Sequence, residues 1–222
     1  MIWLIALPGA DVVAIATVVD IDERVYRLAL TIDEIEMIRG CIDDDDPLAL
    51  QEAIEFFRIT DVDLPNLLNG PFTRRTSATG KPFSEGRFSN GDYAVFYSAH
   101  ERDTAGHEYA HNAPKYFHAS MGTDVQFRIH LIDCQFAGTA SELRPLAAKF
   151  PELVADTHDF CHEVGRAGVA AALDGFLATS VRNPGGTTVP VFSRAALSDP
   201  QRIGNAVCEV NAVAATAIVR FV

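Results

Sequence analysis

His107, Glu108 and His111 form the pattern with the most defined chemistry in this chain. On a helix, two histidines four residues apart share one face, where their imidazoles could hold Zn²⁺. Glu108 would then act as general base on a metal-bound water, as in a zinc metallopeptidase. Such a site needs a third protein ligand, and Glu142 and Glu152 are downstream candidates. The pattern leaves a zinc peptidase open as one function.

A cluster of basic residues lies before this segment. Arg74, Arg75, Lys81 and Arg87 fall within residues 61–92, a stretch rich in Gly, Pro, Ser, Asn and Thr that predicts mainly loop structure. The chain as a whole has 18 Lys and Arg against 30 Asp and Glu, a formal net charge of -12. A local basic cluster in so acidic a chain indicates an anionic ligand, with a solvated surface loop as the alternative.

Charge and cysteine content limit the partners and the compartment. A sequence-independent nucleic-acid binder needs a basic face, so we expect no direct nucleic-acid contact, and an acidic chain is not expected to dock on an anionic membrane. The apolar start, residues 1–7, is too short to span a membrane and lacks the basic flank of a signal peptide. We expect a cytoplasmic protein with buried free thiols at its widely spaced cysteines, Cys41, Cys134, Cys161 and Cys208.

The elements that must position these residues mix strands and helices without regular βα alternation, which predicts an α+β fold. Hydrophobic periodicity predicts strands at residues 1–7, 11–19, 25–30, 93–98, 124–134, 175–180, 188–192, 206–211 and 213–222. Helices are expected at residues 101–113, 143–153 and 157–173, and on either side of four aspartates at residues 43–46. We interpret those aspartates as a solvated loop that caps the following helix, with a divalent-cation site as the alternative.

Three blocks of sequence, in order, resemble the RES-domain family. Residues 86–108 contain a Gly-Arg-Phe-Ser turn, a strand with a Tyr, and a Thr-Ala-x-x-Glu helix. Upstream, residues 67–75 resemble the family's L-L-x-x-P-F-R segment. Downstream, residues 174–192 resemble its D-G-x-x-x-x-S-V-R-x-x-G-G strand–turn–strand. The blocks span more than half of the chain, and their order carries the resemblance more than any single block.

The family is named for an Arg, a Glu and a Ser. By position, the Glu is Glu108 and the Ser is Ser180. The family places its Arg directly after Phe, where this chain has Thr73, so Arg74 or Arg75 must take the role, and we prefer Arg74.

Two further positions match the family, and one departs from it. The second family Arg corresponds to Arg87, and the strand Tyr corresponds to Tyr97. Ala178 stands where an aromatic residue is usual, which puts the shape of the pocket in doubt rather than its chemistry.

The resemblance implies a compact mixed-sheet domain like the ADP-ribosyltransferase toxins, over residues 61–222, preceded by an extension of unknown role, residues 1–60. It implies an enzyme that breaks the nicotinamide–ribose bond of NAD⁺ by phosphorolysis or hydrolysis, without a metal. Glu108 would stabilise the oxocarbenium ion, with Arg74 and Ser180 as the other catalytic residues. NAD⁺ would be bound by Arg75, Arg87 and Tyr97.

The same resemblance implies a toxin of a toxin–antitoxin system. We expect an Xre-type antitoxin as partner, in a higher-order complex. Three alternatives from other classes stay open: an ADP-ribosyltransferase that modifies a protein, the zinc peptidase, and a non-catalytic binding module with a degenerate first Arg.

Overall fold

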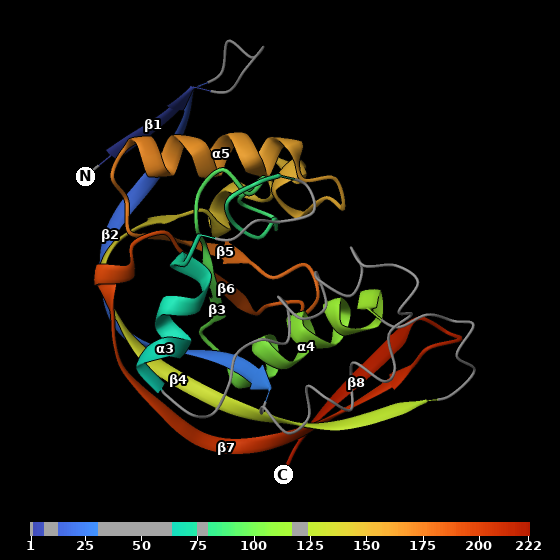
Figure 1. Ribbon diagram of the computed structural model, residues 1–222. Coiled ribbons are helices and arrows are strands. Elements are labelled where there is room, and N and C mark those ends of the chain that lie inside the picture. Colours follow the sequence, from blue (N-terminus) through green and yellow to red (C-terminus); the bar gives the residue numbers. More distant parts are fainter. Residues whose placement is uncertain (1, 7–12, 31–63, 75–79, 117–123) are drawn as a thin grey trace.

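An eight-stranded mixed sheet organises the chain (Figure 1). The computed structural model describes residues 2–6, 13–30, 64–74, 80–116 and 124–222. The strand order is β1-β2-β3-β6-β5-β4-β7-β8, and of these pairings only β4 with β5 is parallel. The strands are β1 (Ile2–Ala6), β2 (Val13–Leu30), β3 (Phe96–Ala99), β4 (Val125–Glu142), β5 (Gly175–Thr179), β6 (Thr187–Val191), β7 (Leu197–Asn211) and β8 (Thr216–Phe221).

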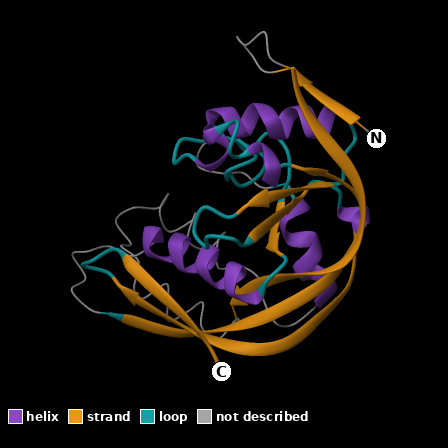
Figure 2. Ribbon diagram, turned by 180° about the vertical axis from the view of Figure 1, so that it is seen from behind, coloured by secondary structure: helices purple, strands orange, loops and turns teal. Residues whose placement is uncertain are grey.

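An additional pairing between β2 and β4 joins the middle of the sheet into a ring of β2, β3, β6, β5 and β4. Residues 17–30 of β2 pair with residues 129–142 of β4 along their whole length. β1 and the β7–β8 pair extend the sheet beyond this ring. The long strands β2, β4 and β7 curve into an arc, which Figures 1 and 2 show from opposite sides.

The helices lie against the concave side of this arc (Figures 1 and 2). They are α3 (Leu64–Asn69), α4 (Arg102–Asn112) and α5 (Asp159–Ala170), with short 3₁₀ turns η1 (Gly70–Phe72), η2 (Ala113–Tyr116), η4 (Arg144–Leu146), η5 (Pro151–Val154) and η6 (Arg194–Ala196). α4 packs against β8, where Gly106 lies so close to Phe221 that an added Cβ would be 3.3 Å from its ring. α4 therefore sits between the β7–β8 extension and the β5–β6 turn.

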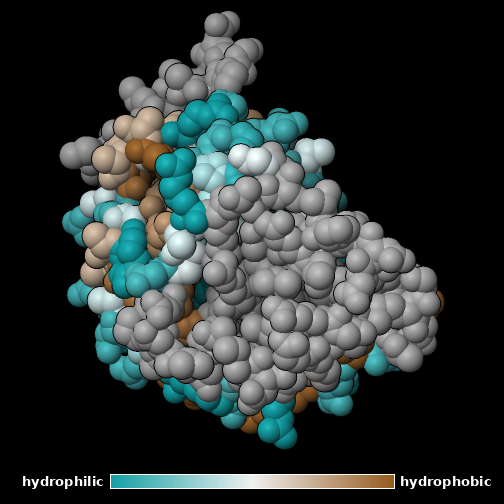
Figure 3. Space-filling view, viewed as in Figure 1, coloured by the Kyte–Doolittle hydropathy of each residue, from teal (hydrophilic) through white to brown (hydrophobic). Residues whose placement is uncertain are grey.

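α5 buries one face, which carries Cys161 and Val164, against Phe88 and Phe176. The rings of Phe88 and Phe176 meet edge to face at 5.4 Å, a favoured aromatic geometry. In Figure 3 the described surface over α5 is hydrophilic toward one end of the helix and apolar toward the other.

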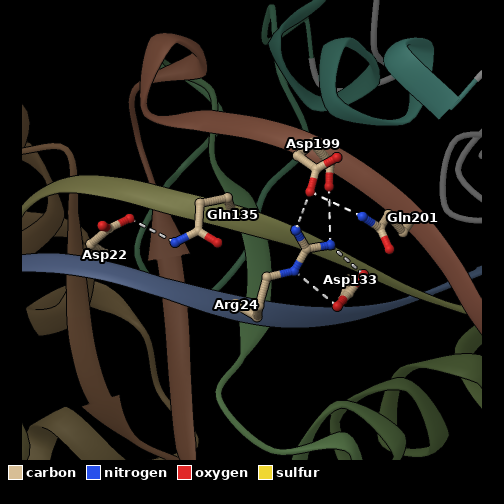
Figure 4. Close-up of polar contacts among 6 residues, drawn as sticks. All are labelled: Asp22, Arg24, Asp133, Gln135, Asp199 and Gln201. Atoms are coloured by element: carbon tan, nitrogen blue, oxygen red, sulfur yellow. Dashed lines mark hydrogen bonds and ion pairs between the residues drawn. The ribbon is translucent and has the colours of Figure 1, made fainter.

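A polar network ties three strands together on the sheet (Figure 4). Arg24 of β2 donates to both carboxylate oxygens of Asp133 on β4, at 2.9 and 2.6 Å, and to Asp199 of β7 at 2.6 Å. Bonds to Asp133 are the first cause of a raised pKa of the Arg24 guanidinium. Asp199 has a positive φ of 47°, which costs a non-glycine residue roughly 1 kcal/mol. Its bonds to Arg24 offset that cost.

The structure confirms the helix expected at 101–113, the one expected at 157–173, and the opening strand. The two strands expected at 11–19 and 25–30 are one strand, β2. Asp20 and Asp22 are exposed and Ile21 between them is buried, and the pairing with β4 continues without a break from Asp20 to Arg24.

One other secondary-structure prediction was wrong. Residues 143–153 form the 3₁₀ turns η4 and η5 instead of one helix. Pro145 and Pro151 lie in the first turns of η4 and η5, and Pro151 lacks the N–H that a continuous helix would need at its position. The described part of residues 61–92 is mainly loop, as expected, with α3 and η1 as its helical segments.

The expected mixed sheet with few helices is seen, and the described part of the N-terminal extension belongs to it as β1 and β2. The domain boundary expected near residue 60 lies outside the described residues. The four aspartates at residues 43–46, the helices expected on either side of them, and Cys41 lie outside them as well. The other three cysteines are free and buried, as expected. Among the described residues, no helix is long and apolar enough to cross a membrane.

Candidate functional site

Glu108 and Ser180 meet although 72 residues separate them along the chain. The Ser180 hydroxyl donates to Oε1 of Glu108 at 2.6 Å. Glu108 lies on α4, and Ser180 directly follows β5, with 3% of its surface exposed. The same hydroxyl oxygen accepts from the backbone N–H groups of Arg182, at 3.2 Å, and Asn183, at 3.0 Å. The hydroxyl therefore directs its proton at Glu108 while its oxygen accepts from the turn.

A second link joins α4 to the same turn. Thr104, one helical turn before Glu108, is fully buried. Its hydroxyl accepts from the side-chain amide of Asn183 at 2.9 Å and donates to Glu101 at 2.7 Å. Glu101 in turn accepts from the backbone N–H of Thr187 at 2.9 Å. The Thr-Ala-x-x-Glu pattern therefore places two polar side chains, four residues apart, on the one face of α4 that meets the β5–β6 turn.

The glycines of the β5–β6 turn let it approach α4 closely. Gly185 has a φ of +87°, a conformation that side chains disfavour. A Cβ on Gly186 would overlap the hydroxyl of Thr104. The turn is closed by backbone bonds from Ser180 to Gly186 and from Gly186 to Asn183, both 2.9 Å long. Glycine at these positions thus sets the distance between Ser180 and Glu108.

Arg87 lies in the Gly-Arg-Phe-Ser turn and binds main-chain carbonyls. Its guanidinium donates to the carbonyl of Ala155 at 2.7 Å and, more weakly, to that of Leu153 at 3.4 Å. The structure gives it no ion pair with a carboxylate of the described residues. The Arg87 charge is one cause of the lowered pKa of His158, after partial burial of that ring.

The buried hydroxyl end of Tyr97 fixes the backbone of this turn. Its hydroxyl accepts from the N–H of Phe88 at 3.0 Å, and burial raises the pKa of the phenol. A Cβ on Gly86 would lie 2.5 Å from the same hydroxyl. A ring nitrogen of His162 lies 2.9 Å from the Gly86 carbonyl. Tyr97 and α5 thus hold the turn that carries Arg87.

The remaining predicted residues are not joined to this pair. Arg74 is exposed after η1, and it has no hydrogen bond to Glu108 or Ser180. Arg75 lies outside the described residues. Neither Arg87 nor Tyr97 bonds directly to Glu108.

The two histidines of the His-Glu-x-x-His pattern, His107 and His111, are exposed on α4. Partial desolvation, and then the charge of Arg182, lower the pKa of His111. Within the described ranges, no three His, Cys, Asp or Glu side chains gather closely enough to hold a metal ion. Glu108, the expected base of that pattern, instead accepts a hydrogen bond from the Ser180 hydroxyl.

Sequence reasoning did not single out Thr104, Asn183 or Arg182 as contributors to the site. The signal for Thr104 was its spacing of four from Glu108, which puts both on one helical face. Asn183 and Arg182 follow Ser180 within three residues, and a serine at the start of a turn often accepts from backbone N–H groups two or three residues on.

A comparison with protein-family models agrees with the sequence blocks. A family model described as the RES domain matches residues 55–210. No curated protein matches the sequence. A chain in the crystal structure of the M. tuberculosis MbcT–MbcA toxin–antitoxin complex superposes with a TM-score of 0.44 at 14% identity, covering 84% of this chain and 86% of that chain. Because the family model spans more than half of the sequence, the chain belongs to the RES-domain family.

Proposed function

We propose that this RES-domain chain is a toxin-like enzyme that cleaves the nicotinamide–ribose bond of NAD⁺. The observation that carries the proposal is the Glu108 carboxylate, held at 2.6 Å by the buried Ser180 hydroxyl. A fixed carboxylate suits a reaction in which positive charge develops on a sugar carbon, because it stabilises that charge without reorganising. The family resemblance supplies the substrate.

In the proposed reaction, the bond from C1′ of the ribose to the nicotinamide nitrogen breaks, and its electron pair leaves with nicotinamide as a neutral molecule. No acid is needed at the leaving group. Glu108 faces the oxocarbenium ion and accepts from the ribose 2′-OH. An oxygen of the acceptor then bonds to C1′. Phosphate gives ADP-ribose-1″-phosphate, and water gives ADP-ribose and a proton.

The other predicted residues take binding roles in this proposal. Arg87, and Arg74 or Arg75, would contact the pyrophosphate, since a guanidinium matches phosphate oxygens in pairs. Ser180 keeps Glu108 oriented, and Tyr97 borders the nicotinamide while it holds the Arg87 turn. The proposal includes a fold of the ADP-ribosyltransferase type and action in the cytoplasm, where free buried thiols stay reduced.

A toxin that consumes NAD⁺ must be inhibited in the cell that produces it. We therefore include an Xre-type antitoxin, in a higher-order complex, as the partner. Purification of the tagged chain from its native host checks this part. A small DNA-binding-type protein that co-purifies in fixed ratio and blocks activity is expected, and an active chain purified alone would contradict it.

The test of the function is nicotinamide release from NAD⁺ by the purified chain, with and without phosphate. Glu108→Gln should lower the rate by about 10²–10³-fold, the typical effect of losing one charge-stabilising group. Glu163→Gln on α5, a partly exposed carboxylate paired with Arg166, is the matched control and should keep full activity. No release from folded wild-type protein free of antitoxin would overturn the proposal.

A further inference from the structure

We propose that Arg182, together with Lys115, binds a phosphate group beside the Glu108–Ser180 pair. The inference rests on the proposed function for its place in the reaction, and on the positions of these cations for the site itself. The ligand chemistry is a phosphate group with at least one free oxyanion, supplied either by inorganic phosphate or by the pyrophosphate of the dinucleotide.

Arg182 is fixed at its backbone and open at its side chain. Its N–H donates to the Ser180 hydroxyl at 3.2 Å, so the residue is anchored to the site. Its guanidinium makes one hydrogen bond to the rest of the described chain, a 3.2 Å contact with Asp156. That carboxylate is 85% exposed and so is weakly held. Most of the five guanidinium donors are left for a ligand.

Other arginines of this chain are engaged more fully. Arg24 binds two carboxylates of neighbouring strands. Arg144 binds both oxygens of Glu142. A guanidinium that is already paired in this way has few donors for a ligand. Arg182 differs from them by its single long contact.

Lys115 follows Glu108 along the same helical segment. It lies on η2, which continues α4, seven residues after Glu108 and thus on the same helical face. Its ammonium group donates to Asn112 at 2.8 Å, and the Asn112 amide donates to the Glu108 carbonyl at 2.9 Å. Desolvation, and then the charge of Arg182, lower the pKa of Lys115.

Arg87 brings a third positive charge to the rim of this region. It binds the carbonyl of Ala155, while Arg182 binds the carboxylate of the next residue, Asp156. The two guanidinium groups therefore attach to adjacent residues. Like charges repel one another, and a bound phosphate would attract each of them and offset that repulsion. Arg182 is suited to hold it through paired N–H bonds, and Lys115 as a point charge.

The experiment is a thermal denaturation titration of the full chain with inorganic phosphate and, separately, with ADP-ribose. A ligand that binds the folded state raises Tm with concentration, and the curve gives an apparent affinity. The variants are Arg182→Gln and Lys115→Gln. Arg166→Gln on α5, an arginine 51% exposed and paired with Glu163, is the charge-matched control. Arg182→Lys keeps the charge without the paired bonds, and Tm without ligand reports the integrity of each fold.

Wild type and the control should be stabilised, and Arg182→Gln should weaken the affinity by about 10- to 100-fold, the effect of one charge-assisted bond. Arg182→Lys should fall between. Loss confined to ADP-ribose assigns the pyrophosphate as the source, and loss with inorganic phosphate assigns the free anion. Equal stabilisation of every variant, or none of wild type by either ligand, would overturn the subsite. Nicotinamide release is measured in a separate assay. If the protein binds phosphate through Arg182 but releases no nicotinamide, the subsite stands and the proposed function is removed.

Discussion

Removal of the Ser180 hydroxyl tests how α4 is joined to the β5–β6 turn. Ser180→Ala deletes the bond to Glu108 and leaves the N–H groups of Arg182 and Asn183 without their acceptor. A bond to a charged group contributes about 1.5–3 kcal/mol and a neutral one about 0.5–1.5 kcal/mol. Because Glu108 is partly exposed, the lower values apply, and we expect a total loss of about 2.5 kcal/mol. In a chain of 222 residues, that lowers Tm by roughly 5–10 °C.

A double-mutant cycle with Glu108→Ala isolates the bond between the two side chains. The free energy of unfolding is measured by denaturant titration for wild type, both single variants and the double variant. In the Glu108→Ala background, Ser180→Ala should lower the free energy of unfolding by about 1.5 kcal/mol less than it does in wild type. The charge-assisted bond is already absent in that background, so the second substitution cannot remove it. The cost of the two turn N–H groups should persist. Additive effects, within about 0.5 kcal/mol, would refute the coupling of Glu108 and Ser180.

Two further predictions concern the packing of α5 and the response to pH. A Cβ on Gly165 would overlap the backbone carbonyl of Phe88, so Gly165→Ala should cost about 3 kcal/mol or more of unfolding free energy; Gly204→Ala, with open space around it, should change it little, and equal effects would contradict the packing. His111 and His158 have pKa values lowered in the folded state, so the unfolded chain takes up protons first as pH falls below about 6.5. Stability should therefore fall below that pH, and a double His→Gln variant should lose part of the slope; an unchanged slope would contradict the assignment.

The site was predictable where its chemistry follows a local period. The Thr-Ala-x-x-Glu spacing placed Glu108 on a helix with Thr104 on the same face, and α4 forms there. Ser180 was expected at the end of a strand, where it lies. The hydrogen bond between Glu108 and Ser180 joins segments 72 residues apart, and local sequence patterns do not predict it.

The rest depended on tertiary packing. The five-stranded ring is closed by the pairing of β2 with β4, which lie about a hundred residues apart in the sequence. Hydrophobic periodicity does not reveal such a pairing. The contacts of Arg87 with backbone carbonyls, and the place of Tyr97 below the turn, follow from how η5 and β3 pack around that turn. A residue type predicts what a side chain can bind, and the neighbouring elements decide what it does bind.

The most direct test of the central claim is a crystal structure of the Glu108→Gln variant with NAD⁺ bound. The account predicts the nicotinamide ribose beside position 108, with its 2′-OH in hydrogen-bonding range, roughly 3 Å, of the new side chain. Ser180 should keep its contacts with the β5–β6 turn. A dinucleotide bound with its nicotinamide ribose away from Glu108 and Ser180, or seated elsewhere on the sheet, would contradict the account.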